Sequence, residues 1–250
     1  MVRHRDIFDT TVVELEKADF NSPVVLGGFV GPTLTGFIAA SYIIERMGLH
    51  QIGHVRSPHI PPMAVFIGKK LRTPFRIYTN KGGTLVVMIC EVPIDDDGLY
   101  EVSQAMMDWM EDKNPQEIVV LEGAPTGEIV KEHKVYCIAN ERRIEQFTKN
   151  GIEAAHSALI TGMGGAMLNE CLARKVAGTS LITPASINIP DPGAVLSLIQ
   201  TVNSVFKFRI DTGILEENVK EFHDQLNELM DQYKKFMKKG EKGPVETMYG

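Results

Sequence analysis

Residues 23–47 read PVVLGGFVGPTLTGFIAASYIIERM, and this stretch decides which fold the sequence favours. Its first four residues are a short apolar run, which is typical of a buried strand. The glycine-rich residues 27–37 come next, and the residues up to Met47 favour a helix that Gly48 can end. Small residues in this helix would allow it to lie close to a sheet. A strand, a glycine turn and a buried helix together predict the opening of an α/β fold.

The rest of the chain continues to alternate between the two patterns. Strand patterns occupy residues 50–56, 63–67, 75–80, 84–90, 118–121, 134–139 and 179–183. Helix patterns occupy residues 99–110, 141–149 and 163–174, and another begins near residue 192. The glycines at residues 81–83 predict a hairpin between two of the strands. We therefore expect an α/β fold with a mixed, mostly parallel central sheet flanked by helices.

The composition is that of an ordinary globular protein. Of the 250 residues, 44% are hydrophobic and 23% are charged, which excludes a disordered, collagen-like or disulfide-scaffold chain. We expect a single α/β domain over residues 1–239, including a C-terminal helix at about residues 214–238. A flexible tail over residues 240–250 would follow, because that segment has glycines, a proline and no periodicity.

Charge and cysteine usage exclude several classes of function. The net charge of -6 argues against a general nucleic-acid binder, and no apolar run suits a membrane span or a signal peptide. Cys90, Cys137 and Cys171 form no CxxC pair, which argues against a structural zinc site or a disulfide framework. We expect a cytoplasmic protein with neither nucleic acid nor membrane as a partner.

The C-terminal helix has the clearest periodicity in the chain. Seven apolar residues are separated by 4, 3, 4, 3, 4 and 3 positions, namely Leu215, Val219, Phe222, Leu226, Leu229, Tyr233 and Phe236. This spacing is an a/d seam three heptads long. Two interpretations stay open, a helix that packs on its own domain and a helix that pairs between the subunits of a homo-oligomer.

Two glycine clusters open helices and are the candidates for a ligand crevice. The first contains Gly27, Gly28 and Gly31, and the second contains Gly164 and Gly165. Two such turns beside one sheet edge can form a small-molecule crevice. The first cluster lacks the GxGxxG spacing of a phosphate-binding turn. A tight turn with close packing is therefore the alternative to phosphate binding.

Recognisable catalytic and metal-binding patterns are missing from the sequence. His50, His54 and His59 are close in sequence but form no HExxH motif. A cation site at the acidic residues 95–97 is one interpretation, and an N-cap at Asp97 with a solvated turn is the simpler one. There is no GxSxG elbow. We expect no catalytic residue, no metal and no cofactor.

Basic residues cluster in two places. Lys69, Lys70, Arg72 and Arg76 form one patch, and a second patch of lysines lies within residues 234–242. Solvated faces are one interpretation of these patches, and complementarity to an acidic protein surface is the other.

Four segments, in one order along the chain, carry a family resemblance. They are GGFVGPTLTGFIAASYII at residues 27–44, LEGAPTGE at 121–128, GMGGAMLNE at 162–170 and PDPGAVLSLIQTV at 190–202. Together they resemble the proteasome assembly chaperone family in its archaeal form, over about residues 20–235. The resemblance implies a fold similar to the nucleoside phosphorylases without an established catalytic residue set. It also implies binding to the α-ring of the 20S core particle without a need for nucleotide.

The resemblance gives the tail a role. Chaperones and activators of the core particle end in a hydrophobic residue, a tyrosine and any residue, and here Met248, Tyr249 and Gly250 fit that pattern. In that position the terminal carboxylate can pair with a cation while the tyrosine ring fills an apolar slot. We expect these three residues to bind the 20S proteasome α subunits. Gly250 contributes only its backbone and carboxylate.

The leading interpretation is therefore a non-enzymatic, ATP-independent proteasome assembly chaperone or activator that forms a homo-oligomer. A second chaperone chain is an additional candidate partner. One alternative is a small-molecule enzyme of nucleoside phosphorylase or ligase type that uses the glycine crevice. The other is a purely structural oligomer whose tail has no partner.

Overall fold

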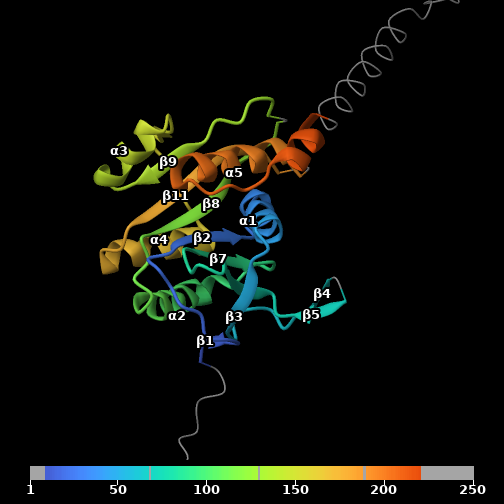
Figure 1. Cartoon of the computed structure of the whole chain (residues 1–250), viewed down its shortest axis with the longest axis vertical. Helices are drawn as coiled ribbons and strands as arrows, with labels where there is room; N and C mark the ends of the chain where they lie inside the picture. Colours follow the sequence, from blue (N-terminus) through green and yellow to red (C-terminus); the bar gives the residue numbers. More distant parts are fainter. Residues whose placement is uncertain (1–8, 68, 129, 188–189, 221–250) are drawn as a thin grey trace, which may run out of the picture. The chain divides into compact units, whose positions relative to one another are not determined.

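The computed structural model describes residues 9–67, 69–128, 130–187 and 190–220 (Figure 1). The chain divides into two units, Met1–Asp211 and Thr212–Gly250. The first unit holds the α/β fold, and the described part of the second is helical over residues 213–220. The single domain over residues 1–239 and the continuation of this helix to residue 238 stay predictions.

A nine-stranded sheet runs through the described part of the first unit. In spatial order its strands are β1 (Thr11–Glu14), β3 (His50–Arg56), β6 (Phe75–Thr79), β7 (Leu85–Cys90), β2 (Val24–Phe29), β8 (Glu117–Thr126), β11 (Gly178–Ser186), β9 (Tyr136–Ala139) and β10 (Glu153–Ala154). A separate hairpin is formed by β4 (Val65–Ile67) and β5 (Lys70–Arg72). The strands β1, β5 and β10 were not expected from the sequence.

The sheet is mixed, as expected, but it is not mostly parallel. Among the eight neighbouring pairs of described strands, four are parallel: β7–β2, β2–β8, β8–β11 and β9–β10. The other four are antiparallel. Short connections explain part of this difference, because a turn of a few residues can join only antiparallel strands. The predicted hairpin between β6 and β7 is confirmed, and Gly83 turns it with φ of +60°.

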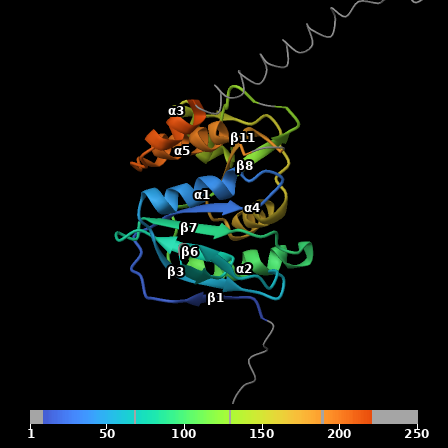
Figure 2. The same ribbon diagram turned by 90° about the vertical axis from the view of Figure 1, so that its right-hand side faces the viewer.

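Helices cover both faces of the sheet, as the sequence predicts (Figures 1 and 2). They are α1 (Thr35–Arg46), α2 (Leu99–Glu111), α3 (Glu141–Lys149), α4 (Gly162–Arg174) and α5 (Pro192–Phe206), with a short 3-10 turn, η1 (Asp96–Gly98), before α2. No helix in the described ranges is both long and apolar enough to cross a bilayer.

The two faces of the sheet at strand β2 are covered by different helices. Val25 and Phe29 belong to the buried cluster that contains the apolar residues of α2 and α4. Gly28 lies on the opposite side of the strand, where an added Cβ would clash with Ala40 of α1. Because successive residues of a strand face opposite sides, α1 covers one face and α2 with α4 covers the other. The expected close approach of the first helix to the sheet is confirmed.

Candidate functional site

The two glycine clusters meet at one cavity of about 80 Å³. It lies where the parallel strands β2 and β8 end and α4 begins. Its lining comprises Phe29, Val30, Gly31, Pro32, Glu122, Gly123, Pro125, Leu159, Ile160, Thr161, Gly162, Met163, Gly164 and Ile182. After β2 the chain continues to β3, which lies toward the β1 edge of the sheet, and after β8 it continues to β9, which lies toward the β10 edge. Crevices at such a switch point, at the carboxyl ends of strands, are the usual ligand sites of open α/β sheets.

Only two of the five glycines proposed for the crevice line this cavity. Gly31 and Gly164 are part of its wall, whereas Gly27, Gly28 and Gly165 are not. Gly28 has a packing role, since a side chain there would collide with α1. At Gly165 a Cβ would lie 2.6 Å from the carbonyl oxygen of Ile160, so this glycine allows the loop before α4 to pass closely. Close packing therefore accounts for the glycines outside the cavity wall.

Glu122 is the residue at this site that the sequence did not reveal. It follows the buried run of β8 and is half-buried as a residue. Gly164 leaves room for its carboxyl group, because an added Cβ would clash with Oε1. Burial raises the pKa of Glu122 to about 7. None of the ion pairs and hydrogen bonds among the described residues involves its carboxyl group, so a neutral carboxyl near neutral pH has an unused donor and acceptor.

The N-terminus of α4 supplies further donors beside this carboxyl. Gly162, Met163 and Gly164 are the first three residues of the helix. Their N–H groups have no hydrogen-bond acceptor within the helix, because each helix leaves its first N–H groups without one. The N-cap residue Thr161 makes no side-chain hydrogen bond to them. The partial positive charge of a helix N-terminus favours a negative group nearby.

A second polar cluster ties the loop before β9 to α5. His133 Nε2 lies 3.1 Å from Asp191 Oδ1, and His133 Nδ1 lies 3.0 Å from the Pro184 carbonyl oxygen. Asp191 also caps α5 by accepting a hydrogen bond from the Ala194 N–H at 3.2 Å. Burial lowers the pKa of His133, but Asp191 and the Pro184 carbonyl outweigh that effect and raise it. The polar groups of this cluster contact one another and hold the loop against α5, which is a structural role.

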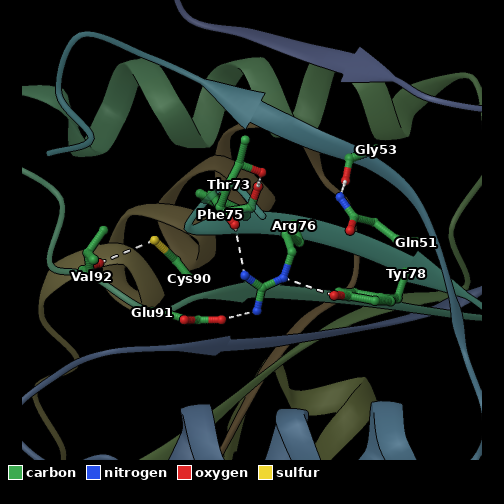
Figure 3. A network of polar contacts seen from close by, with 9 residues as sticks. All are labelled: Gln51, Gly53, Thr73, Phe75, Arg76, Tyr78, Cys90, Glu91 and Val92. Carbon is green, nitrogen blue, oxygen red and sulfur yellow. Dashed lines mark hydrogen bonds and ion pairs between the residues drawn. The ribbon is translucent and has the colours of Figure 1, made fainter. Parts of the chain in front are cut away.

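One of the four residues of the first predicted basic patch is buried in the structure. Arg76 is buried and lies between strands, where its guanidinium pairs with Glu91 and donates to the Tyr78 hydroxyl at 2.9 Å and to the Thr73 carbonyl at 2.8 Å (Figure 3). This arginine is therefore a structural anchor and not part of a solvated face. Lys69 and Lys70 are exposed on the β4–β5 hairpin.

That hairpin also exposes two apolar side chains. Phe66 and Leu71 are cross-strand partners that are 69% and 73% exposed. Directly opposite residues of a hairpin share one face, so the two side chains form a small apolar surface next to the lysines.

Most of the predicted docking and oligomerisation residues lie outside the described residues. Leu215 and Val219 fall in the helical residues 213–220. The seam residues Phe222, Leu226, Leu229, Tyr233 and Phe236 and the tail residues Met248, Tyr249 and Gly250 belong to residues 221–250, which the structure does not describe. Their roles stay predictions.

The described residues can also be searched for metal ligands and reactive thiols. Within them, no group of three or more His, Cys, Asp or Glu residues is arranged to hold a metal ion. The three cysteines are buried and free. Burial raises the pKa of the Cys90 thiol to about 11 and that of Cys171 to about 12, so these thiols are poor nucleophiles at neutral pH.

Comparisons with known proteins identify relatives across the whole α/β unit. The model of the PAC2 family matches residues 25–230. A Thermoplasma acidophilum protein of unknown function is 49% identical, with a TM-score of 0.75 over 89% of this chain and 92% of that chain. Pyrococcus furiosus PbaA, an archaeal homolog of proteasome-assembly chaperone, is 21% identical, with a TM-score of 0.79 over 97% and 100%. Pyrococcus furiosus PbaB, an archaeal proteasome activator, is 22% identical, with a TM-score of 0.78 over 89% and 99%.

Proposed function

The chain belongs to the PAC2 family, and on that premise we propose that it is a proteasome assembly chaperone or activator. The observation that carries the proposal is the family match over residues 25–230, to which PbaA and PbaB add the same fold across nearly the whole chain. The protein would act by binding, without nucleotide and without a catalytic residue.

We assign docking on the 20S α-ring to the C-terminal tail. Met248 and Tyr249 would bury their side chains between neighbouring α subunits, and Gly250 would place a carboxylate near a cation there. The assignment requires that Gly250 carries the free terminal carboxylate. Eleven residues from Gly240 span at most about 36 to 40 Å when extended, which sets the reach of the tail.

A single tail of this composition should bind weakly. Burying one tyrosine and one methionine contributes about 1.5 to 3 kcal/mol each, and ordering the segment opposes this. Several tails held together raise the avidity by roughly 10² to 10⁴ when their spacing fits the ring. The proposed function therefore includes a homo-oligomer that presents several tails at once.

The experiment is surface plasmon resonance on immobilised archaeal 20S core particles. Tyr249→Ala, and separately a few residues added after Gly250, should abolish binding while the oligomeric state stays unchanged. Tyr100→Ala removes a tyrosine that is 55% exposed on the α/β unit and is the matched control, which should bind as the unmodified chain does. Undiminished binding by both tail variants would remove the tail from the mechanism.

A further inference from the structure

The cavity at the ends of β2 and β8 has one ionisable side chain. Of the fourteen described residues that line it, only Glu122 can titrate. Two polar features lie beside one another there. Glu122 enters from β8, and the first turn of α4 enters with Gly162 and Gly164, which have no side chains to cover their N–H groups.

The walls around these donors are largely apolar. Phe29 comes from β2, Ile182 from β11 and Met163 from α4, and Leu159 and Ile160 come from the loop before α4. A cavity of about 80 Å³ exceeds the roughly 10 to 15 Å³ that one water needs, so it holds a molecule of a few heavy atoms. The ligand should therefore be small, with one polar end and a short apolar part.

Charge decides which polar end fits. The N-terminus of α4 disfavours a cation and favours an anion. No cationic side chain is among the described residues that line the cavity, and burial disfavours the charged form of the Glu122 carboxyl group. Since its pKa is raised to about 7, the neutral carboxyl is well populated at neutral pH and can donate its O–H. An incoming oxyanion would then receive one hydrogen bond from Glu122 and others from the backbone.

We propose that this cavity binds a short-chain monocarboxylate, whose oxygens accept from the Glu122 carboxyl group and from the α4 N-terminus while its alkyl part contacts the apolar wall. Inorganic phosphate has the same oxyanion chemistry, but it has no apolar part for Phe29 and Ile182 and needs more donors. No tail residue is among the lining residues given above. The proposal about the cavity can therefore be tested independently of proteasome binding.

The experiment is a titration of the isotope-labelled full chain with sodium propionate, followed by ¹H–¹⁵N NMR of the Gly162 and Gly164 amides. At pH 6 we expect saturable shifts of these amides. Because only the neutral form of Glu122 donates, the apparent affinity should fall about tenfold between pH 6 and pH 8. Sodium chloride at equal ionic strength is the salt control, and phosphate and methylammonium chloride are the competing probes.

Two variants isolate the carboxyl group. Glu122→Gln keeps a donor of the same shape and loses the titration, so propionate should bind with an affinity that no longer changes between pH 6 and pH 8. Glu122→Val removes the donor and should bind at least tenfold more weakly than the unmodified chain at pH 6.

Three results would overturn the proposal. The first is the absence of shifts at Gly162 and Gly164 with the unmodified chain at pH 6 and 100 mM propionate. The second is tighter binding of methylammonium as the pH rises, which would show a cation site. The third is tighter binding of phosphate than of propionate. The pH series on the unmodified chain decides the matter even when a variant does not fold.

Discussion

At the scale of single residues, several buried charged groups in the described part of the α/β unit are paired, and Glu122 differs from them. Arg76 pairs with Glu91, Arg143 with Glu117 and His133 with Asp191, and in each pair at least one partner is buried. Buried charges are costly unless they are compensated in this way. Glu122 has no such compensation, and the raised pKa of its carboxyl is the physical consequence.

Glu122→Gln should therefore change how stability depends on pH. The pKa of Glu122 is about 7 in the folded chain against an ordinary value of 4.5, so between these values the unfolded chain loses a proton that the folded chain keeps. The stability contributed by the neutral carboxyl is present below pH 4.5 and is lost as the pH rises to about 7. Glutamine avoids that loss, so the variant should gain about 3 kcal/mol relative to the unmodified chain at pH 8 and almost nothing at pH 4.5.

Urea denaturation at the two pH values measures this difference. Glu128→Gln removes an exposed carboxylate at the end of the same segment and controls for the change in net charge. A Glu122→Gln difference that is equal at pH 4.5 and pH 8 would show that burial does not perturb this group.

At the scale of secondary-structure elements, the contact between α1 and the sheet depends on glycine. Gly36 lies in the first turn of α1, and an added Cβ would clash with the Leu121 carbonyl oxygen of β8. A backbone atom in a central strand cannot move away easily. Gly36 therefore lets α1 lie directly against β8.

Gly36→Ala should destabilise the protein by about 1 to 3 kcal/mol through overpacking, although alanine is the better helix former. Gly82→Ala is the matched control, because no atom lies within 4 Å of a Cβ at that exposed turn. The control should stay within about 0.5 kcal/mol of the unmodified chain. Thermal unfolding of both variants provides the comparison, and equal stability of the two would contradict the packing argument.

The sequence predicted the elements better than their arrangement. Apolar periodicity and glycine turns were sufficient for α1, α2 and α4, whereas the two-residue β10 has no pattern to detect. The first strand was expected to end before a glycine turn, but Gly27 and Gly28 belong to β2, which continues to Phe29. The expected strand over residues 118–121 is longer in the structure, because β8 continues to Thr126 where β11 pairs with it. The paired residues of β8 and β11 are about 60 positions apart in the sequence, so a local sequence pattern cannot predict that they pair.

The same reasoning explains what was missed at the candidate site. The two glycine clusters were found because glycine before a helix is a local signal. Glu122 was not singled out, because a lone glutamate between Leu121 and Gly123 has no periodicity or spacing that marks it. It becomes conspicuous only when β8 and α4 are brought together and leave its carboxyl group without a partner.

The predicted C-terminal helix over about residues 214–238 would have its role in assembly. A seam of seven apolar residues exceeds what a solvent-facing helix needs, so we expect it to contribute to contacts between subunits. Leu226→Glu combined with Leu229→Glu should reduce the molar mass measured by light scattering. A monomeric unmodified chain at tens of micromolar would contradict the expected oligomer, and an oligomer that survives both substitutions would place the contact elsewhere.

At the scale of the whole molecule, the α/β unit is followed in the sequence by the segment proposed for docking. The unit carries the PAC2 fold and a cavity of its own, and the proposed tail would bring the molecule to the proteasome. The two activities use different residues. Substitutions at Glu122 should therefore leave proteasome binding intact, and substitutions at Tyr249 should leave the cavity intact.

Electron microscopy of the full chain mixed with purified archaeal 20S core particles tests the central claim most directly. The account predicts additional density over the α-ring at one or both ends of the particle, and no such density with a chain that ends at Glu246. Bare particles with the full chain, density along the sides of the particle, or equal capping by the shortened chain would contradict it.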